Sequence, residues 1–290
     1  MLVKFDGVTT MKNIIYYSIS VVFVFSTVFL LNNNNVHAND YYFVKSSADF
    51  FFSNFEYKPS SSDFDIKNFH YKGKRESNVM KGGSFSLGII MSEKIMTVLD
   101  CSYREGDYEF LGDYILEDTS IALKYDIHRK DMDLKFSIIT PFFIKNFNIL
   151  YSFGQRVYET ETKEYLSGDW VWTGNNKQVR IIDKTVRTTY ACLGLGWILG
   201  KIGTVKTSVK GEVALILNAN GEFSIDGFKE KKDSPKGIYQ LYTFQMNMPL
   251  KKGSIFIDNG WHFQQIEFDK SIGEDLWYGY YGRAGFIYLF

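Results

Sequence analysis

Histidines and closely spaced carboxylates are the residues of this chain that could carry acid–base chemistry. Apart from His37, the sequence contains only His70, His128 and His262, and histidine is the side chain that titrates near neutral pH. The alternating pattern described below places His128 and His262 on the inward faces of two separate strands, with Asp126 and Asp258 beside them. Two interpretations stay open for this set. One is an Asp–His dyad or a metal site across an interior; the other, which we favour, is a hydrogen-bond network that holds no metal.

A second pair of carboxylates, Asp131 and Asp133, is spaced one residue apart. Residues i and i+2 of a strand lie on one face, so this pair could share a proton or bind a cation. The neighbouring cations Arg129 and Lys135 lie on the same predicted face. We therefore expect salt bridges rather than catalysis.

The strands that must position these residues are indicated by an alternation of apolar and polar side chains with a period of two residues. It is clearest where Val205, Val209, Val213, Leu215 and Leu217 alternate with Lys206, Ser208, Lys210 and Glu212. The final segment repeats it, with the aromatics Phe286, Tyr288 and Phe290 in one register and Tyr281 and Arg283 in the other. Aromatics at the ends of an apolar band with this period are typical of lipid-facing strands. The sequence predicts an all-β, transmembrane, antiparallel up-and-down barrel of about ten long strands.

The predicted connections alternate in length. The short ones are 92–93, 143–146, 200–203 and 251–253, and the long ones are 58–77, 105–119, 160–184, 219–236 and 268–276. Short turns on one side and long loops on the other are the pattern of membrane barrels. Several segments approach twenty residues, whereas about 9–11 cross the hydrocarbon. We expect the surplus to stand beyond the outer leaflet as a β-wall.

One segment is predicted to change phase. Ile121, Leu123, Tyr125 and Ile127 are predicted outward, but after Asp131 the outward set becomes Met132, Leu134, Phe136 and Ile138. A β-bulge would shift the register in this way. A hairpin turn would do so too, and the two alternatives remain open. A similar slip is expected near Gln264 and Gln265.

The predicted inward face carries charges of both signs. Its members are Lys124, Asp126, His128, Arg156, Lys206, Lys210, Glu212, Asp258, His262 and Arg283. Charges of both signs indicate ion pairs that close the lumen, whereas a selective pore would be lined by charges of one sign. A small channel is the alternative.

The chain begins with a candidate targeting segment. Residues 14–31 carry no charge, follow a basic residue at Lys12 and precede Val36-His37-Ala38. This order is typical of a signal peptide over 1–38, cleaved after Ala38; a membrane-anchoring helix is the alternative. Residues 39–290 are then one barrel domain.

Composition limits the partners. Lys plus Arg and Asp plus Glu number 33 each, so no net field attracts nucleic acid. Cys101 and Cys192 fall on opposite predicted faces, so we expect no disulfide. We expect no cofactor.

The last strand, with Phe286, Tyr288 and Phe290, resembles the terminal strand of bacterial outer-membrane barrels. That resemblance implies recognition by the barrel-insertion machinery and residence in the bacterial outer membrane. The expected partners are outer-membrane lipid, lipopolysaccharide included, and that machinery. We expect a monomer, and the sequence identifies no surface ligand.

Several short matches extend the resemblance to one family. They are Asp118-Thr119, Lys145-Asn146, Gly154-Gln155 with Tyr158, and Tyr190-x-x-Leu193-Gly194-Leu195. In this order they resemble the omptins, the aspartyl-type proteases of the outer membrane. The resemblance covers most of the chain after residue 38 as a pattern of long strands.

Omptin chemistry, as the resemblance implies it, needs two aspartates spaced one apart in the second long loop and an Asp–His couple in the fourth. Asp113 matches one aspartate, but Leu111 stands where its partner should be, and 218–226 contains no histidine. We therefore expect a barrel without hydrolytic activity that acts as a surface scaffold for binding or adhesion. A divergent endopeptidase using Asp113 is the alternative.

The third long loop offers binding candidates. Trp170 and Trp172 lie between Gly168 and Gly174. Exposed tryptophans could stack on a ligand or enter the outer leaflet. Their alternation is equally compatible with a strand extension.

Overall fold

The computed structural model describes residues 41–58, 74–75, 78–91, 95–116, 119–167, 179–225, 227–268 and 274–290. These residues form twelve strands, of which ten are long and two, β2 and β9, are short. Their bounds are β1 Tyr41–Lys58, β2 Lys74–Arg75, β3 Asn78–Met91, β4 Ile95–Leu116, β5 Thr119–Pro141, β6 Phe147–Ser167, β7 Val179–Ile202, β8 Val205–Ile225, β9 Phe228–Asp233, β10 Lys236–Leu250, β11 Gly253–Glu267 and β12 Glu274–Leu289.

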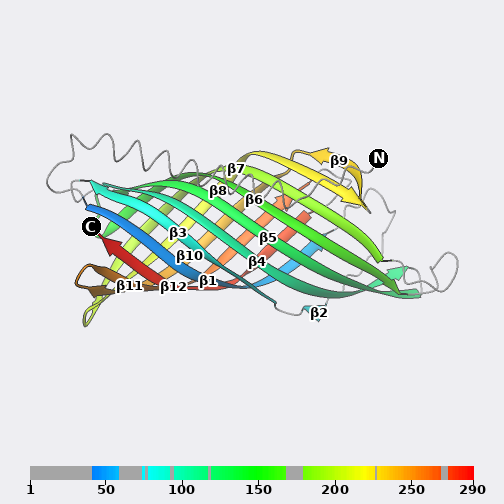
Figure 1. The fold of residues 1–290 in the computed structure, drawn as a ribbon, viewed down its shortest axis with the longest axis horizontal. Helices are drawn as coiled ribbons and strands as arrows, with labels where there is room; N and C mark the ends of the chain where they lie inside the picture. Colours follow the sequence, from blue (N-terminus) through cyan, green and yellow to red (C-terminus); the bar gives the residue numbers. More distant parts are fainter. Residues whose placement is uncertain are drawn as a thin grey trace.

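The ten long strands close into a ring. Each pairs antiparallel with its neighbours in the chain, except that β1 pairs with β3 past the short β2, β8 pairs with β10 past the short β9, and β12 pairs back to β1. The strands run obliquely around an elongated cylinder, with β2 and β9 toward the end away from the C-terminus (Figure 1). The predicted antiparallel barrel is confirmed.

The wall of the barrel is uneven in height. Strands β4 to β8 have 21 to 24 residues, whereas β10 and β11 have 15. The expected long loop 105–119 is wrong, because β4 runs to Leu116 and β5 begins at Thr119. Most of 160–184 and 219–236 is likewise strand. The expected β-wall is present, and it takes up most of the residues that were expected to form loops. In extended hairpins the backbone N–H and C=O groups bond to one another across the strands and need no other partner.

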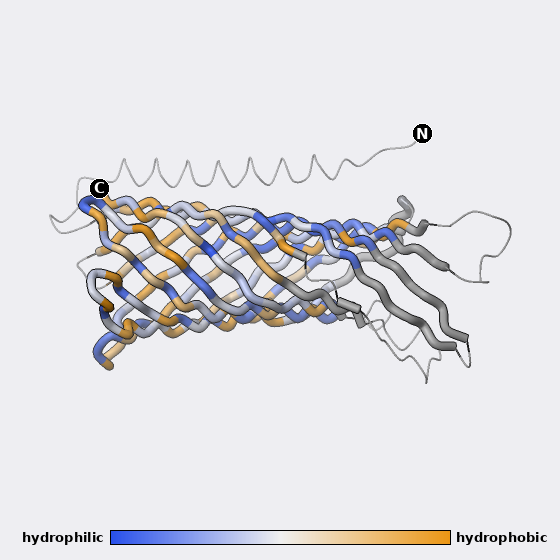
Figure 2. Tube along the Cα trace, turned by 90° about the horizontal axis from the view of Figure 1, so that it is seen from below, coloured by the Kyte–Doolittle hydropathy of each residue, from blue (hydrophilic) through white to orange (hydrophobic). Residues whose placement is uncertain are grey.

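The outer surface of the half near the short turns is apolar. Leu215 and Phe286 are 58% and 62% exposed there, and the other exposed apolar residues of β6 to β8 that lie in this half include Tyr151, Phe153, Leu193 and Leu195. Apolar and polar residues alternate along the strands (Figure 2). Such a band matches hydrocarbon outside and polar groups inside.

The half near the long hairpins has the opposite polarity. Two apolar clusters fill its interior, one around Tyr158, Val186 and Ile266 and one around Ile127 and Trp277. Charged residues occupy the outer face. Above the apolar band the outside solvent is water, so burial of apolar side chains inside the barrel becomes favourable.

This inversion corrects the predicted phase change. The pairing of β5 with β4 and with β6 is uninterrupted, so neither a bulge nor a hairpin is present in β5. Ile127 and Arg129 face inward and are buried, and His128 therefore faces outward together with Asp126. The slip expected near Gln264 is also wrong, since β11 pairs without a break and Gln264 and Ile266 both point inward.

Bulges occur elsewhere, between β7 and β8. The register shifts between Thr189 and Tyr190, where Leu217 of the partner strand is left without an opposite residue, and again between Ile198 and Gly200. At the first of these bulges the buried residues of β8 change from even-numbered ones, such as Ala214, to odd-numbered ones, such as Ala219.

The seam between the first and last strands is regular. β1 and β12 pair from Phe43 with Leu289 to Lys58 with Glu274. Tyr42 and Phe290 exchange backbone hydrogen bonds of 3.2 and 3.1 Å. The first strand begins at Tyr41 and brings Lys45 and Asp49 into the lumen.

Cys101 and Cys192 are both free thiols, one on the outer face and one buried inside, as expected. Within the described ranges, no helix has the length and hydrophobicity to cross a membrane. The predicted signal peptide, 1–38, and its cleavage point at Ala38 lie outside the described residues.

Candidate functional site: the polar lumen and its closure

The lumen contains a cavity of about 530 Å³ lined by residues of all ten long strands. Near the short turns its lining includes Ile198, Lys206 and Leu289, and toward the long hairpins it reaches Phe51 and Trp277. The cavity thus extends from the short-turn end to the middle of the barrel.

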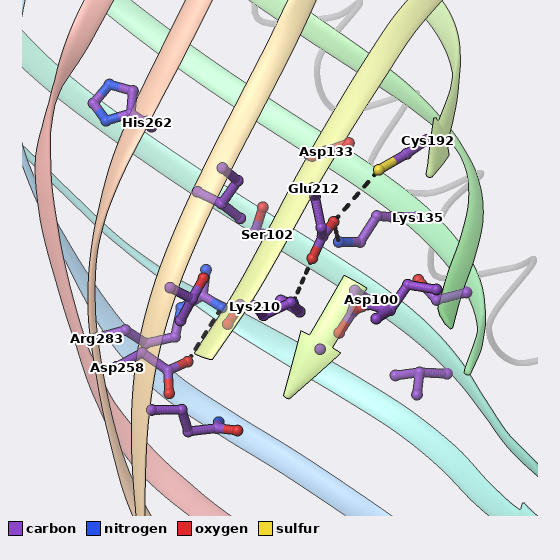
Figure 3. Close-up of a pocket in the computed structure, with 18 of the residues that line it drawn as sticks. Asp100, Ser102, Asp133, Lys135, Cys192, Lys210, Glu212, Asp258, His262 and Arg283 are labelled. Atoms are coloured by element: carbon purple, nitrogen blue, oxygen red, sulfur yellow. Dashed lines mark hydrogen bonds and ion pairs between the residues drawn. The ribbon is translucent and has the colours of Figure 1, made fainter. Parts of the chain in front are cut away.

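Glu212 is the centre of the polar groups nearest the short turns. Its carboxylate accepts a hydrogen bond of 3.0 Å from Lys135 Nζ and forms a second ion pair with Lys210. The Cys192 thiol lies 3.6 Å from the same carboxylate (Figure 3). A buried carboxylate between two ammonium groups has its charge compensated, which offsets the cost of removing it from water.

A second group joins β1, β4, β11 and β12. Arg283 Nε donates to Asp49 at 3.0 Å. Arg283 Nη1 lies 4.0 Å from Asp258, which also pairs with Lys45 at 3.6 Å. Arg104 approaches Asp49 at 3.8 Å. These ions connect the two sides of the β1–β12 seam.

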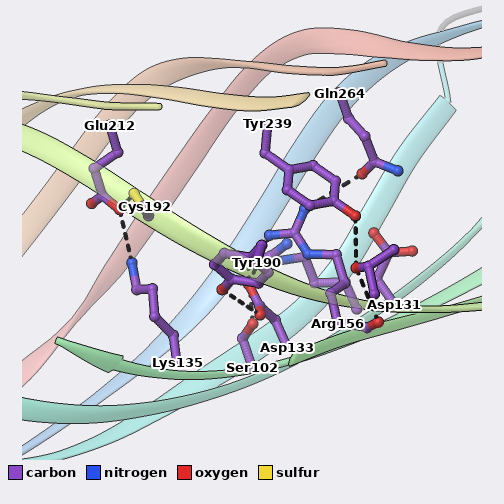
Figure 4. Close-up of polar contacts among 12 residues, drawn as sticks. Ser102, Asp131, Asp133, Lys135, Arg156, Tyr190, Cys192, Glu212, Tyr239 and Gln264 are labelled. Atoms are coloured by element: carbon purple, nitrogen blue, oxygen red, sulfur yellow. Dashed lines mark hydrogen bonds and ion pairs between the residues drawn. The ribbon is translucent and has the colours of Figure 1, made fainter. Parts of the chain in front are cut away.

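A third group lies in the middle of the barrel. Arg156 donates to Asp133 at 2.7 Å, and the Tyr190 hydroxyl donates to the same carboxylate at 2.7 Å. Arg129 donates to Asp131 at 2.6 Å, so the expected salt bridge of Asp131 is present. Both arginines also donate to the amide oxygen of Gln264 (Figure 4).

Aromatic side chains close the lumen above this layer. The Arg129 guanidinium lies 3.8 Å from the Trp277 ring centroid and 4.6 Å from that of Tyr158. Lys184 forms an ion pair with Asp275, and Tyr158 donates to the same carboxylate at 3.4 Å. Trp277, Tyr158, Arg129 and Asp275 are all at most 2% exposed, so the described side chains fill this part of the interior.

Most of the residues predicted for the lumen line the cavity. These are Arg156, Lys206, Lys210, Glu212, Asp258, His262 and Arg283. Asp126 and His128 are corrected to the outer face, so the two histidines do not meet across the lumen. The side chain of Lys124, on β5, is outside the described part of the chain.

The other predicted residues divide in the same way. Phe286, Tyr288 and Phe290 are exposed on the apolar outer band. Asp113 lies in β4, paired with Ala122, but its side chain is not among those described, and Trp170 and Trp172 fall outside the described ranges.

Sequence reasoning missed several members of the lumen. Lys45, Asp49, Lys184 and Asp275 belong to it because their strands extend beyond the alternating segments. On β1, apolar and polar side chains do not alternate between the two faces, because Phe43 and Phe51 share the inward face with Lys45 and Asp49. The usable signal was that Lys45 and Asp49 are separated by an even number of positions, four, and so share one face of a strand whatever residues lie between them.

Across the outer wall of β4 to β7 runs a row of ionisable residues. Asp107, His128, Glu161 and Asp183 are opposite one another on successive strands. His128 Nδ1 lies 2.6 Å from Asp107, whose side chain is 86% exposed. Partial burial, and then repulsion from Glu161, raise the pKa of Asp183.

This row lacks the features of a catalytic or metal site. No group of three or more potential ligands that could hold a metal is present among the described residues. The Asp107–His128 couple sits on an open convex wall, where water competes for each group. The row is a charged surface on the outer wall.

Comparison with known proteins supports the fold. No protein-family model matches the sequence, and no curated protein matches it significantly. Among solved structures, the outer-membrane protease OmpT from Escherichia coli matches with a TM-score of 0.51 and 7% identity, over 89% of this chain and 99% of that one. The translocator domain of the autotransporter NalP from Neisseria meningitidis matches with a TM-score of 0.41 and 12% identity, over 94% and 96%.

An identity of 7% carries information about the fold and not about the reaction. The omptin resemblance is confirmed at that level: a closed barrel of ten long antiparallel strands. The chain has the fold of an outer-membrane β-barrel.

Proposed function

We propose that the protein is a surface scaffold of the bacterial outer membrane that binds a partner through its tall outer wall and does not hydrolyse it. The observation that carries this proposal is the combination of a filled lumen with a charged wall above the apolar band. A pore needs an open path, whereas the described aromatic and ionic side chains fill the upper lumen. Of the described residues, those of the wall remain available to an external partner.

The charge of that wall suggests the chemistry of the partner. Among the side chains that the structure describes, eight carboxylates face outward on β4 to β8, against three cations. The acids are Glu105, Asp107, Glu109, Asp126, Glu159, Glu161, Asp183 and Glu222, and the bases are Lys130, Lys163 and Arg187. An acidic surface favours a basic polypeptide, and electrostatic complementarity raises the association rate.

The proposal includes the route to the membrane. Export by a signal peptide cleaved after Ala38, insertion as a monomer, and contact of the Phe286–Phe290 band with lipid all agree with the apolar outer face. Lipopolysaccharide and the insertion machinery remain proposed partners.

The experiment uses the refolded protein in liposomes and a basic reporter peptide of alternating Lys and Ser. We expect saturable binding that weakens as salt rises, because a surface attraction is screened within a Debye length. It should strengthen as the pH rises through the raised pKa of Asp183. The double variant Glu161→Gln, Asp183→Asn should bind about threefold or more weakly.

The matched control is Glu267→Gln, an exposed carboxylate on the shorter wall of β11. It should leave binding unchanged. Equal weakening by the control, or no binding to either wall, would contradict the proposal. Cleavage of the peptide that disappears in Asp113→Ala would favour the endopeptidase instead, and steady conductance steps in planar bilayers would favour the channel.

A further inference from the structure

Three polar side chains in the middle of the lumen have donors without acceptors. Arg129 Nη1, Arg156 Nε and Gln264 Nε2 are buried and have no hydrogen-bond partner among the described residues. Arg129 and Gln264 are 1% and 4% exposed. Buried donors without acceptors are rare, because they lose their hydrogen bonds to water.

These three side chains converge on one point. Arg129 Nη2 and Arg156 Nη1 lie 3.2 and 3.4 Å from the same atom, Gln264 Oε1. Two guanidinium groups thus donate to one amide oxygen. The three free donors, Arg129 Nη1, Arg156 Nε and Gln264 Nε2, are each two covalent bonds from an atom that takes part in these hydrogen bonds. All three side chains line the 530 Å³ cavity.

Two more side chains, each with a buried nitrogen that makes no hydrogen bond, line the cavity beside this point. His262, two residues from Gln264 on the same face of β11, meets the Phe51 ring edge to face at 5.1 Å. The Arg104 guanidinium lies 4.1 Å over the same ring. Arg104 Nε and His262 Nδ1 also lack hydrogen-bond partners among the described residues, and both side chains line the cavity.

The charges around the cavity do not balance. Seven cations stand against six carboxylates on the described walls above the mouth. The cations are Lys45, Arg104, Arg129, Lys135, Arg156, Lys210 and Arg283, and the carboxylates are Asp49, Asp100, Asp131, Asp133, Glu212 and Asp258. A low-dielectric interior disfavours an unmatched charge. One additional negative charge would compensate it.

The cavity also offers a route for that charge. Lys206 and Lys210 lie on β8 between the short turns and the middle of the barrel, and Lys135 is bridged to Lys210 through Glu212. Cations spaced along a walled passage attract anions and raise their local concentration.

We propose that the lumen binds a small tetrahedral oxyanion, of the phosphate or sulfate class, at Arg129, Arg156 and Gln264, and that the anion enters from the short-turn end. Arg129 Nη1 and Arg156 Nε each offer one free donor, and the Gln264 amide supplies a further one. Hydrogen bonds from a guanidinium to such an anion are charge-assisted and therefore strong. Arg104 and His262 flank the site. This inference concerns the interior and is independent of the outer-wall function proposed above.

The test measures binding of inorganic phosphate and of sulfate to the refolded protein in detergent micelles by calorimetry. Trp277 gives a second readout, because Arg129 lies 3.8 Å from its ring centroid and its fluorescence should change on binding. We expect one site per barrel, with a Kd of about 1 mM or tighter, and acetate at least tenfold weaker.

The informative variant is Gln264→Met, which removes the amide without changing charge or much volume. It should weaken binding about tenfold. Gln245→Met is the matched control, since Gln245 on β10 lines the same cavity but lies outside the site, and it should leave the affinity unchanged. Heat-dependent migration on a denaturing gel shows that both variants are folded.

Three results would overturn the proposal. One is the absence of phosphate and sulfate binding at about 10 mM by folded wild-type protein. Another is an equal effect of the two glutamine variants. The third is equal affinity for acetate, which would replace the tetrahedral class by a carboxylate.

Discussion

At the scale of single residues, Glu212 shows how the lumen tolerates buried charge. It is held between Lys135 and Lys210, and its removal leaves two ammonium groups without their shared carboxylate. Loss of one partner from a buried ion pair costs about 3 kcal/mol or more. We expect Glu212→Gln to lower the free energy of unfolding by about that amount, measured by denaturant unfolding in micelles.

Its surface counterpart is Glu161→Gln. Glu161 pairs with Lys163 at 3.3 Å, but both side chains are nearly half exposed, and such pairs contribute about 0–1 kcal/mol. If the two variants unfolded at the same denaturant concentration, the lumen network would be a solvated lining rather than a structural core.

Ile127 and His128 make the inversion of polarity testable at adjacent positions. Ile127 is 4% exposed within the cluster around Trp277, whereas His128 is on the outer wall. Ile127→Ala should cost about 2–4 kcal/mol in the free energy of unfolding, as for other buried large-to-small changes. His128→Ala should change it by about 0.5 kcal/mol or less.

The phase predicted from the sequence requires the reverse ranking of these two variants. Denaturant unfolding of both in one detergent decides between the two phases. Equal costs would mean that neither face of β5 is buried at this level.

At the scale of elements, the seam between β1 and β12 depends on a close approach of backbones. A Cβ added to Gly285 would lie 2.0 Å from the carbonyl oxygen of Ser46, whereas one added to Gly282 would have only Asn259 nearby, at 3.8 Å. Both glycines are on β12 and pair with β1. Gly285→Ala should therefore weaken closure of the barrel, and Gly282→Ala should not.

Closure of the barrel is measured by the heat-dependent shift of the protein's migration on a denaturing gel. We expect Gly285→Ala to lose the compact form at a lower temperature than the wild type, and Gly282→Ala to retain it. A Gly285→Ala barrel as heat-resistant as the wild type would show that the seam can adjust to a side chain.

The strand faces in the apolar band could be predicted from the sequence, because lipid outside and polar groups inside impose a strict alternation. Val213 and Leu215 against Lys210 and Glu212 follow it. Above the band the alternation persists, but its sign reverses, as Ile127 and His128 show. A short stretch of sequence shows the period of the apolar–polar alternation, but it does not show whether lipid or water lies outside the strand. For this reason the inward residues of β5 were predicted on the wrong face.

The lengths of the hairpins also could not be predicted from the local sequence pattern. Charged segments such as 105–109 read as loops, yet Asp107 and Glu105 are in register with His128 and Lys130 on β5. Cross-strand pairing of this kind stabilises extended hairpins, and it joins positions that are far apart in the sequence.

At the scale of the whole molecule, strand length and the apolar band together set how far the protein stands above the membrane. The 23 residues of β5, at about 3.3 Å each and a tilt of about 40°, reach roughly 60 Å in height. The 15 residues of β10 reach roughly 40 Å on the same assumptions. An apolar band about 25 Å tall leaves about 35 Å of wall at β5 and about 15 Å at β10.

Atomic force microscopy of the protein in supported bilayers can measure this difference. We expect protrusions on one face of the membrane, each with a high side about twice the height of its low side, and little relief on the opposite face. The Glu161, Asp183 row belongs to the high side, where a bulky partner can reach it without contacting lipid. Low, symmetric protrusions would place that row at the level of the lipid headgroups, where it would meet membrane phosphates rather than a basic polypeptide.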